Sequence, residues 1–514
     1  MNFFYLKNIR IINILIIEFF LITINESNTI KFKIKTLKFY ENNLNINELY
    51  KENYFYYDFI FNNIYCSIKI GFPPQNIVGF ISGQLNEFNI VHEKCFVNNS
   101  KYNRTNSKTF NNLTSFNINH KNFKHGCFAE EDFKFELFID YNINEKKEIN
   151  FPKLKFFLAD DYKINDKFNK NEINSCAIIG LKLNNKDLFK ETPKNFIYYL
   201  MEYFSKIKNK QYNNNYYFLN NFYWTIKYNI ENNDYFSIGE PPHIYDPENY
   251  KTKKFIEFNI ESDSSLYWNV QFSEIFINKN AFNISNEIKL ESIYLKKYSE
   301  AHNCLFYPEI NSFFATIEYF NLIKKEFFNK FFSNNICSEK KIFINSYKLT
   351  VLDNMGGEFK FIFCNKNKIG EYGEDKFYLE FPSLNFYHKL LNKTFIFNGK
   401  ELFFDDKNEN IYFLICVKNN VVDQWIFGKI FMKKYQVIFN SEMKTIGFYL
   451  DNENKNNFDD NPKRTNKYII IFLVVALSFI ISIILLNKYK KVFLKNKKIF
   501  VKELEMINKN EKFI

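Results

Sequence analysis

The chain has 514 residues, of which 46% are apolar and 20% aromatic, while Gly and Pro number only 13 and 10. This composition is typical of a packed protein and excludes a largely disordered one. The net charge of +12 does not indicate a nucleic-acid partner, because residues 487–514 hold nine Lys and three Glu and the remaining excess is spread among acids. Nucleic-acid-binding proteins instead gather Lys and Arg on one face.

The N-terminal segment, residues 1–25, has the layout of a signal peptide. Lys7 and Arg10 precede an apolar run at residues 11–23, and polar residues follow. The alternative is a buried N-terminal strand, because Glu18 interrupts the run. A signal peptide would direct the body of the chain into the secretory pathway.

The body of the chain, from residue 53 on, consists of short apolar or alternating runs between Asn-rich turns, which predicts a mostly β protein. The clearest predicted strands cover residues 65–70, 133–138, 236–239 and 268–277. Apolar residues recur every three or four positions at residues 194–204 and 317–332. This spacing predicts helices.

The C-terminal part predicts one membrane crossing. Residues 451–467 are polar and predict a stalk, and residues 469–486 carry no charge and are long enough for a helix to span about 30 Å of hydrocarbon. We therefore expect a transmembrane helix at residues 468–487, with the membrane as a partner. The Lys-rich tail at residues 488–514 would be cytosolic. The prediction is a single-pass type I membrane protein of the ER, Golgi, vesicles or cell surface.

Five segments of the body together resemble a known family. Residues 65–75 read Tyr-Cys-Ser-Ile-Lys-Ile-Gly-Phe-Pro-Pro-Gln, and residues 424–448 end in Ile-Gly-Phe. The other three segments lie between them at residues 175–181, 234–239 and 267–278. In this order they resemble the pepsin-like aspartic proteases, with a layout closest to the membrane-anchored plasmepsins.

The resemblance implies a fold. It is a mostly β, two-lobed pepsin-like (acid protease) fold with a central cleft, to which this chain adds the C-terminal transmembrane helix. The N-terminal lobe would cover residues 53–240 and the C-terminal lobe residues 241–450.

The resemblance also implies two active-site loops, each with a catalytic Asp followed by Thr or Ser and then Gly. The first loop falls on residues 78–84, where Ile81 stands at the acid position and Ser82 and Gly83 keep the next two positions. The turn is therefore retained without its acid.

The second loop falls on residues 303–312. Tyr307 stands at the acid position, and Pro308-Glu309 replaces the Thr-Gly pair. The chain has no Asp between residues 58 and 132 or between residues 263 and 353. A small shift of the alignment therefore restores neither acid.

Aspartic proteolysis requires two carboxylates that share one proton. Ile81 has no proton to exchange, the Tyr307 phenol with a pKa of about 10 is a poor base, and Glu309 supplies one carboxylate at best. We expect Ile81 and Tyr307 to lie close together on the cleft floor and the chain to be catalytically inactive. Whether it is an enzyme stays open, because the family implies an aspartic endopeptidase.

Three functions remain as alternatives. The first is a pseudoprotease that binds a peptide or protein partner in the secretory pathway without cutting it. The second is an active aspartic endopeptidase of that pathway. The third is a structural membrane glycoprotein whose cleft is filled by Phe80 or Tyr307. No zinc-binding or phosphate-binding motif occurs, so the sequence predicts neither a metal nor a cofactor.

The eight cysteines are compatible with disulfides in an oxidising compartment. The resemblance implies a bond between Cys337 and Cys364. Two weaker pairings are Cys95 with Cys127 and Cys304 with Cys416. Candidate glycosylation sequons lie at Asn98, Asn103, Asn112, Asn283 and Asn392.

Overall fold

The fold is described from a computed structural model of the chain. Its contacts divide the chain into the units Met1–Asn452 and Glu453–Ile514, and every described residue belongs to the first unit. The structure describes residues 29–37, 55–91, 102–114, 123–140, 145–162, 177–183, 194–208, 219, 221–228, 234–260, 267–282, 288–296, 302–344, 357–405, 409–418 and 424–450.

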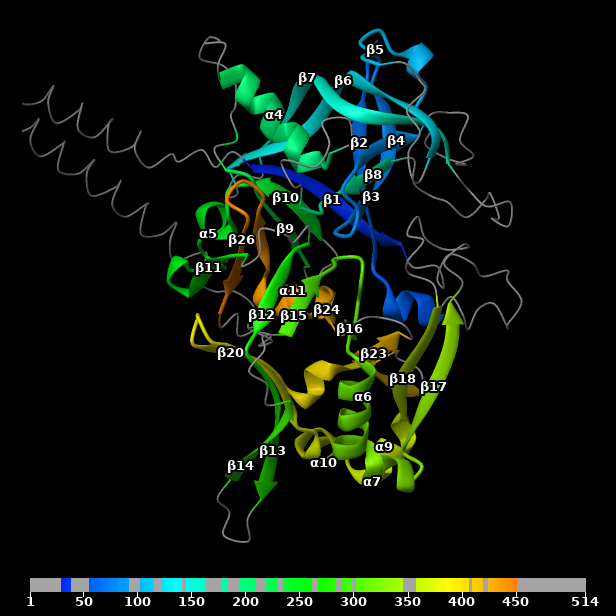
Figure 1. Cartoon of the computed structure of the whole chain (residues 1–514), viewed down its shortest axis with the longest axis vertical. Coiled ribbons are helices and arrows are strands. Elements are labelled where there is room, and N and C mark those ends of the chain that lie inside the picture. The colour runs from blue at the N-terminus through cyan, green and yellow to red at the C-terminus, as the bar shows by residue number, and fades with distance from the viewer. Residues whose placement is uncertain are drawn as a thin grey trace, which may run out of the picture. The chain divides into compact units, whose positions relative to one another are not determined.

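The largest of three sheets formed by the described strands has 13 strands (Figure 1). In spatial order they are β11 (Phe255–Asn259), β26 (Thr445–Tyr449), β25 (Ile438–Asn440), β9 (Tyr223–Lys227), β10 (Tyr235–Gly239), β1 (Thr29–Leu37), β2 (Asn63–Ile70), β3 (Gln75–Ser82), β8 (Ala177–Gly180), β4 (Phe88–Val91), β7 (Glu145–Tyr162), β6 (Phe123–Asp140) and β5 (Asn111–Asn112). The alternation of apolar and polar residues explains why residues 65–70 form part of a strand. In β2, Cys66, Ile68 and Ile70 are buried and the intervening Ser67 and Lys69 are exposed.

The second sheet has nine strands. In spatial order they are β12 (Asn269–Phe272), β15 (His302–Phe306), β24 (Trp425–Phe427), β16 (Phe313–Phe314), β23 (Ile415–Lys418), β18 (Gly357–Asn365), β22 (Asn410–Phe413) and β21 (Phe403–Asp405), with β17 (Cys337–Ile344) paired to β18. The third sheet has four strands. They are β14 (Ile288–Lys296), β13 (Glu274–Phe282), β19 (Ser383–His388) and β20 (Lys393–Phe397).

The predicted strands at residues 65–70, 133–138 and 236–239 lie within β2, β6 and β10. The predicted strand at residues 268–277 is broken at Ser273 into β12 and β13, which belong to different sheets. On one side of the break β12 pairs with β15, and on the other side β13 pairs with β19, to which Ser273 also donates through its N–H to the carbonyl oxygen of Tyr387.

The longest helix among the described residues is α4 (Phe196–Lys208), which packs against β7 (Figure 1). It begins after Asn195, whose Oδ1 accepts a hydrogen bond from the Tyr198 N–H at 2.7 Å. An Asn at this position satisfies an N–H that the helix itself leaves without a partner. The predicted helix at residues 194–204 is thus present and continues about one turn further.

A second helical segment follows Thr316, whose Oγ1 accepts from the Tyr319 N–H. It consists of α6 (Ile317–Ile323), the π-helical turn η3 (Lys324–Phe328) and α7 (Asn329–Ser333). The predicted helix at residues 317–332 is therefore confirmed. The shorter helices are α5 (Pro242–Tyr245), α9 (Lys366–Tyr372), α10 (Glu374–Glu380), α11 (Lys429–Tyr435), η1 (Arg104–Asn106), η2 (Thr252–Lys254) and η5 (Gly399–Leu402). Residues 55–60 are also helical.

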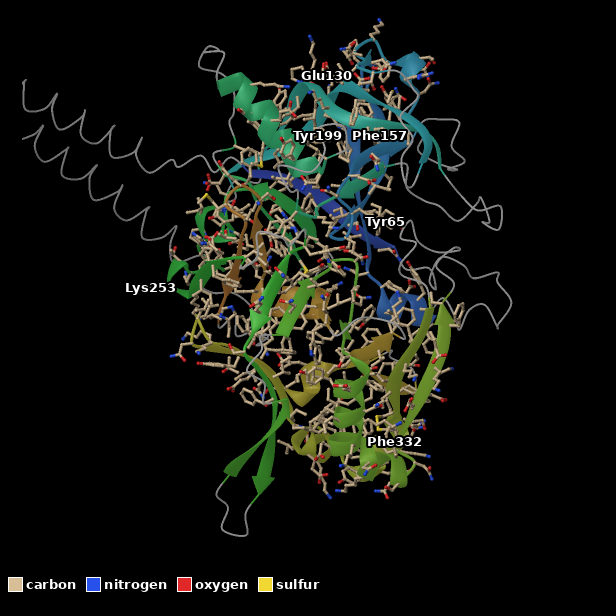
Figure 2. The ribbon with its side chains drawn as sticks, viewed as in Figure 1. Tyr65, Glu130, Phe157, Tyr199, Lys253 and Phe332 are labelled. Atoms are coloured by element: carbon tan, nitrogen blue, oxygen red, sulfur yellow. A yellow bond between two sulfur atoms is a disulfide. The ribbon has the colours of Figure 1, made fainter. Side chains whose placement is uncertain are left out.

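Aromatic side chains form much of the core. Figure 2 shows Phe157 and Tyr199 among the side chains of β7 and α4, and Phe332 among those of α7. Trp224 and Phe439 stack with their ring centroids 4.1 Å apart, which joins β9 to β25. Offset and edge-to-face aromatic pairs add stabilisation beyond the area that they bury.

The architecture corrects the predicted fold class. The chain is mostly β, but its strands do not divide at residue 240, because β11, β25 and β26 follow that residue and belong to the same 13-stranded sheet as the strands that precede it. The reason is burial: every residue of β26 is buried, and such a strand requires neighbours at its edges and cover on both faces. The sheet topology therefore does not support the two-lobed pepsin-like description.

The described part of the chain does not contain the predicted membrane helix. No helix within the described ranges is both long and apolar enough to cross a membrane. The predicted signal peptide (1–25), stalk (451–467), transmembrane helix (468–487) and tail (488–514) all lie outside those ranges. The transmembrane helix of the predicted fold class thus has no counterpart among the described residues.

Candidate functional site

The first loop, residues 78–84, includes the end of β3. Ile81 pairs with Ile179 of the neighbouring parallel strand β8 and has no exposed surface, 0%. Its side chain belongs to the main hydrophobic core, and Ser82 at the end of β3 is also fully buried. The first acid position is therefore part of the core of the 13-stranded sheet.

The second loop, residues 303–312, includes most of β15 and the residues after it. Tyr307 is only 7% exposed, and its N–H donates to the carbonyl oxygen of Phe427 at 3.0 Å. Burial, followed by the negative charge of Glu309, raises the pKa of the Tyr307 phenol well above its usual value. The phenol is therefore protonated at every physiological pH and is unavailable as a base.

The two loops meet through Glu309, which is 2% exposed. The Ser82 hydroxyl donates to Glu309 Oε1 at 2.9 Å, and the Gly83 N–H donates to Oε2 at 3.0 Å. The Gln84 N–H donates to Oε1 at 3.2 Å. One carboxylate thus accepts three hydrogen bonds from three consecutive residues of the first loop.

Close packing accompanies these hydrogen bonds. A Cβ atom at Gly83 would lie 2.6 Å from Cδ of Pro308, so only glycine fits without a shift of the second loop. A Cβ atom at Gly428 would lie 2.2 Å from the carbonyl oxygen of Ile310. The Lys429 N–H, at the start of α11, donates to that same oxygen at 2.7 Å. The second loop is therefore held between the first loop and α11.

Burial raises the pKa of Glu309 above its usual value. The hydrogen bonds from Gly83, Ser82 and Gln84 lower it and offset the burial in part. Glu309 is the only carboxylate in the two loops, residues 78–84 and 303–312. A second acid with which it could share a proton is thus missing from both.

Residues 55–62 cover the second loop. The Asn62 N–H donates to the carbonyl oxygen of Glu309 at 2.8 Å, and Asn62 Nδ2 donates to that of Pro308 at 3.0 Å. In return, Asn311 Nδ2 donates to the carbonyl oxygens of Asp58 at 2.6 Å and Phe61 at 2.9 Å. Figure 1 shows the helical turn of residues 55–60 in blue beside β17 and β18.

Aromatic contacts close the same region. A hydrophobic cluster, which we call the loop cluster, joins residues 56–61 to the two loops and to the nine-stranded sheet. Its members from these parts include Tyr56, Tyr57, Phe59, Ile60, Phe61, Phe80, Tyr307, Ile310 and Phe361. Figure 2 labels Tyr65, whose ring centroid lies 5.5 Å from that of Phe80. Phe80 is 3% exposed, so the two side chains expected to fill a closed cleft, Phe80 and Tyr307, are both buried.

The structure brings three of the predicted site residues into contact and places the other two in separate hydrophobic clusters. Ser82, Gly83 and Glu309 are in direct contact. Ile81 lies in the main core, whereas Tyr307 lies in the loop cluster, so their side chains belong to separate clusters. The described residues contain no group of three or more His, Cys, Asp or Glu side chains that could hold a metal ion.

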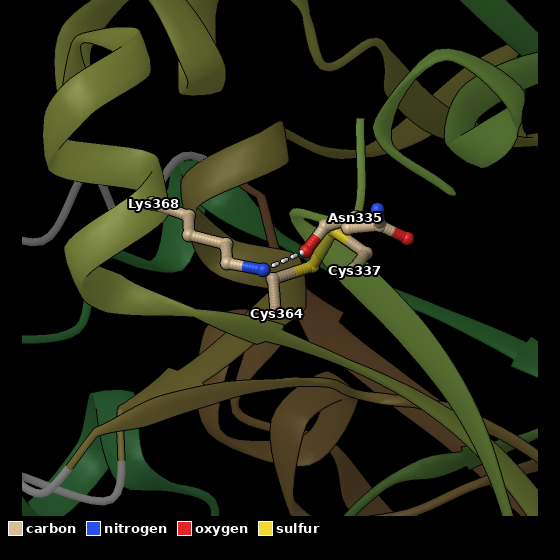
Figure 3. The surroundings of a disulfide bond; sticks show 4 residues. All are labelled: Asn335, Cys337, Cys364 and Lys368. Atoms are coloured by element: carbon tan, nitrogen blue, oxygen red, sulfur yellow. Dashed lines mark hydrogen bonds between the residues drawn. A yellow bond between two sulfur atoms is a disulfide. The ribbon is translucent and has the colours of Figure 1, made fainter. Parts of the chain in front are cut away.

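The cysteines give one disulfide among the described residues. Cys337 and Cys364 are bonded, with their Cα atoms 3.9 Å apart across the β17–β18 pair (Figure 3). Lys368 Nζ donates to the carbonyl oxygen of Asn335 beside the bond at 2.9 Å. The pairing implied by the resemblance is therefore present.

The weaker pairing of Cys304 with Cys416 is not formed, because Cys416 carries a free thiol. Burial raises the pKa of that thiol to about 12, so it is protonated and unreactive. The pairing of Cys95 with Cys127 cannot be described, since Cys95 lies outside the described residues.

The sequence analysis did not identify the residues that cover the second loop or the hydrogen-bond donors to Glu309. The sequence of residues 55–61, Phe-Tyr-Tyr-Asp-Phe-Ile-Phe, could have indicated the cover over the second loop. A segment this apolar is not expected to lie exposed to solvent before β2. No local pattern identifies the three donors to Glu309, which lie 225 to 227 residues away in the chain.

Comparison with known proteins does not assign a family to the chain. No protein-family model matches the sequence, and none of the curated proteins matches it either.

Proposed function

We propose that the chain is a non-proteolytic relative of the pepsin-like aspartic proteases that acts in the secretory pathway by binding a peptide or protein partner. The observation that carries the proposal is the carboxylate of Glu309, which accepts hydrogen bonds from Ser82, Gly83 and Gln84. The only acid of the two loops therefore joins them and is not free to activate a water molecule.

The chemistry of the two-carboxylate mechanism supports this proposal. That mechanism requires one ionised acid as the base and one protonated acid that polarises the scissile carbonyl. A fully buried isoleucine and a buried, protonated phenol stand at the acid positions, Ile81 and Tyr307. Neither side chain accepts a proton from water.

A structural role without a ligand is the second candidate. The burial of Phe80 and Tyr307 beneath residues 55–61 favours it, because a covered loop offers no room for a peptide next to the acid positions. A partner would then have to bind elsewhere on the body. The two candidates share the absence of proteolysis and differ in whether a peptide binds.

A cleavage assay tests the proposal. The purified full chain is incubated with a peptide library between pH 3 and pH 7, with and without pepstatin, and products are identified by mass spectrometry. A pepsin-like protease of known activity serves as the positive control. We expect no pepstatin-sensitive cleavage at any pH.

A variant interprets any cleavage that is found. Glu309→Gln removes the only carboxylate of the loops while keeping the size of the side chain. Pepstatin-sensitive cleavage that disappears in Glu309→Gln would make Glu309 a catalytic acid and would overturn the proposal. Cleavage unchanged in this variant and insensitive to pepstatin identifies a contaminating protease.

A further inference from the structure

A pocket lies between α10, the start of β19 and η5, apart from the two loops. Its volume is about 550 Å³, within the range of about 300–1,000 Å³ typical of ligand sites. Its lining includes Glu374, Asp375, Tyr378, Leu379, Phe381 and Lys400. None of these residues belongs to the loop cluster.

Two carboxylates in this lining differ from the neighbouring acids. Glu374 and Asp375 are exposed and make no hydrogen bond or ion pair within the described part of the chain. In contrast, Glu380 pairs with Lys330 at 2.9 Å, and Glu401 pairs with Lys434 at 2.5 Å. In a protein with a net charge of +12, two adjacent carboxylates that form no ion pair among the described residues make a local acidic site, although Lys400 also lines the pocket.

An apolar surface adjoins the acids. Leu379 is 54% exposed, although it lies two positions from the buried Phe377, and it lines the pocket together with the ring of Tyr378. Burial, followed by the charges of Glu374 and Asp405, raises the pKa of Tyr378, as expected in a negative field. An aromatic ring beside carboxylates is also a favourable environment for a cation.

The walls of the pocket are held in place without a ligand. Phe377 is fully buried and anchors α10, with its ring 6.0 Å from that of Phe381. At the opposite wall, Asn398 and Glu401 form a capping box that starts η5. Lys434 holds Glu401 from α11. A preformed site loses less conformational entropy on binding.

We propose that this pocket binds a peptide segment in which a Lys or Arg side chain adjoins an apolar residue. The basic side chain lies against Glu374 and Asp375, and the apolar residue packs on Leu379. This inference rests on the proposed function, since it names the ligand class of a non-cutting peptide binder and moves its site from the covered loops to α10 and η5.

Fluorescence anisotropy tests the inference on the purified full chain. The probe is the fluorescein-labelled, C-terminally amidated peptide Gly-Ala-Leu-Lys-Leu-Ala-Gly, and its matched controls carry Glu or Gln in place of Lys. We expect the Lys peptide to bind with a dissociation constant below about 100 μM and the controls to bind at least about tenfold more weakly. Raising the salt from 50 to 500 mM should weaken the binding of the Lys peptide.

Matched variants assign the binding to the pocket. The double change Glu374→Gln with Asp375→Asn should weaken the Lys peptide by at least about tenfold, whereas Glu442→Gln, at an exposed acid on the β25–β26 turn, should not. Leu379→Ala should weaken binding by about threefold to tenfold, and Leu390→Ala, which removes a 73% exposed leucine on the β19–β20 turn, should leave it unchanged.

A gain of affinity gives a second readout. Lys400→Glu adds a third carboxylate to the lining and should tighten binding of the Lys peptide. Equal binding of the Lys and Glu peptides, wild-type affinity in the Glu374/Asp375 double variant, or no binding at 1 mM peptide would each overturn the inference. If it is overturned while the chain still cleaves nothing, the proposed function stands; pepstatin-sensitive cleavage would reject the proposed function whatever the pocket binds.

Discussion

The junction of the two loops and the α10–η5 pocket use the same functional group in opposite ways. At the junction, the Glu309 carboxylate is buried and accepts three hydrogen bonds from the chain. At the pocket, Glu374 and Asp375 are exposed and make no such bonds within the described residues. A buried carboxylate must be satisfied internally for the protein to be stable, whereas an exposed one is solvated and is available to a ligand.

Retention of a loop pattern therefore does not imply retention of the chemistry that the pattern serves elsewhere. The first loop keeps Ser82 and Gly83, but both serve here to bind Glu309. We expect the junction to contribute more to stability than the pocket.

The largest expected effect is that of Glu309→Ala. It leaves the buried Ser82 hydroxyl and the buried Gly83 N–H without their acceptor, whereas the Gln84 N–H keeps the Ser82 Oγ as an acceptor at 3.2 Å. Each unsatisfied buried donor costs about 1–3 kcal/mol, so we expect a loss of about 2–5 kcal/mol of stability. Denaturant unfolding measures it, with Glu442→Ala as the exposed control. A loss below about 1 kcal/mol would show that the junction is not a structural centre.

A smaller effect is expected for Gly83→Ala. The new methyl group would lie 2.6 Å from Cδ of Pro308 and would push the two loops apart. Overpacking of this kind costs about 1–3 kcal/mol. Gly370→Ala is the matched control, because nothing lies within 4 Å of the added Cβ in α9, and there alanine should be neutral or stabilising. Thermal unfolding of both variants is the measurement, and equal melting temperatures would contradict the close packing of the loops.

The pH dependence of stability reports on the ionisation of Glu309. Its pKa is raised in the folded chain, so the folded state binds more protons than the unfolded state between the ordinary Glu pKa and the folded value. Stability should therefore fall as the pH rises through that window. Glu309→Gln, which does not titrate, should remove this component. Denaturant midpoints at several pH values between 4 and 8 test it, and identical pH profiles for the two proteins would contradict the raised pKa.

The smallest effect on stability is expected at the pocket. Glu374→Gln with Asp375→Asn should change the free energy of unfolding by at most about 2 kcal/mol, because exposed acids in the first turn of a helix contribute only about 0.3–1 kcal/mol each. Comparison of the unfolding midpoints of this variant and of Glu309→Ala ranks the two regions directly. A double variant as unstable as Glu309→Ala would assign the two acids a structural role.

Local pattern was sufficient for much of the secondary structure. The alternation in residues 65–70 and the helical spacing of residues 317–332 appear in the structure as β2 and as the segment from α6 to α7. The same patterns did not reveal that residues 268–277 cross from one sheet to another at Ser273. Periodicity reports which face of a strand is buried, and carries no information about which neighbour covers it.

The candidate site, like the secondary structure, could be predicted from the sequence only in part. The absence of an Asp from either loop is a property of the covalent chain and can be read from the sequence. The role of Glu309 was not predictable, because its hydrogen-bond donors lie more than 200 residues away in the chain. The pocket was not predictable either, since α10 and η5 carry no motif and only their packing creates it.

Three properties of this protein follow from its amino-acid sequence alone: its mostly β character, the absence of Asp from both loops, and the availability of Cys337 and Cys364 for a bond. Each depends on residue identity or on short-range periodicity, which the chain carries in any conformation. Tertiary structure was required to show that β11, β25 and β26 join the largest sheet, that residues 55–62 cover the second loop, and that one buried carboxylate joins the two loops. These features arise from contacts between segments far apart in the chain, and such contacts are selected by the burial and hydrogen-bond satisfaction of the whole fold.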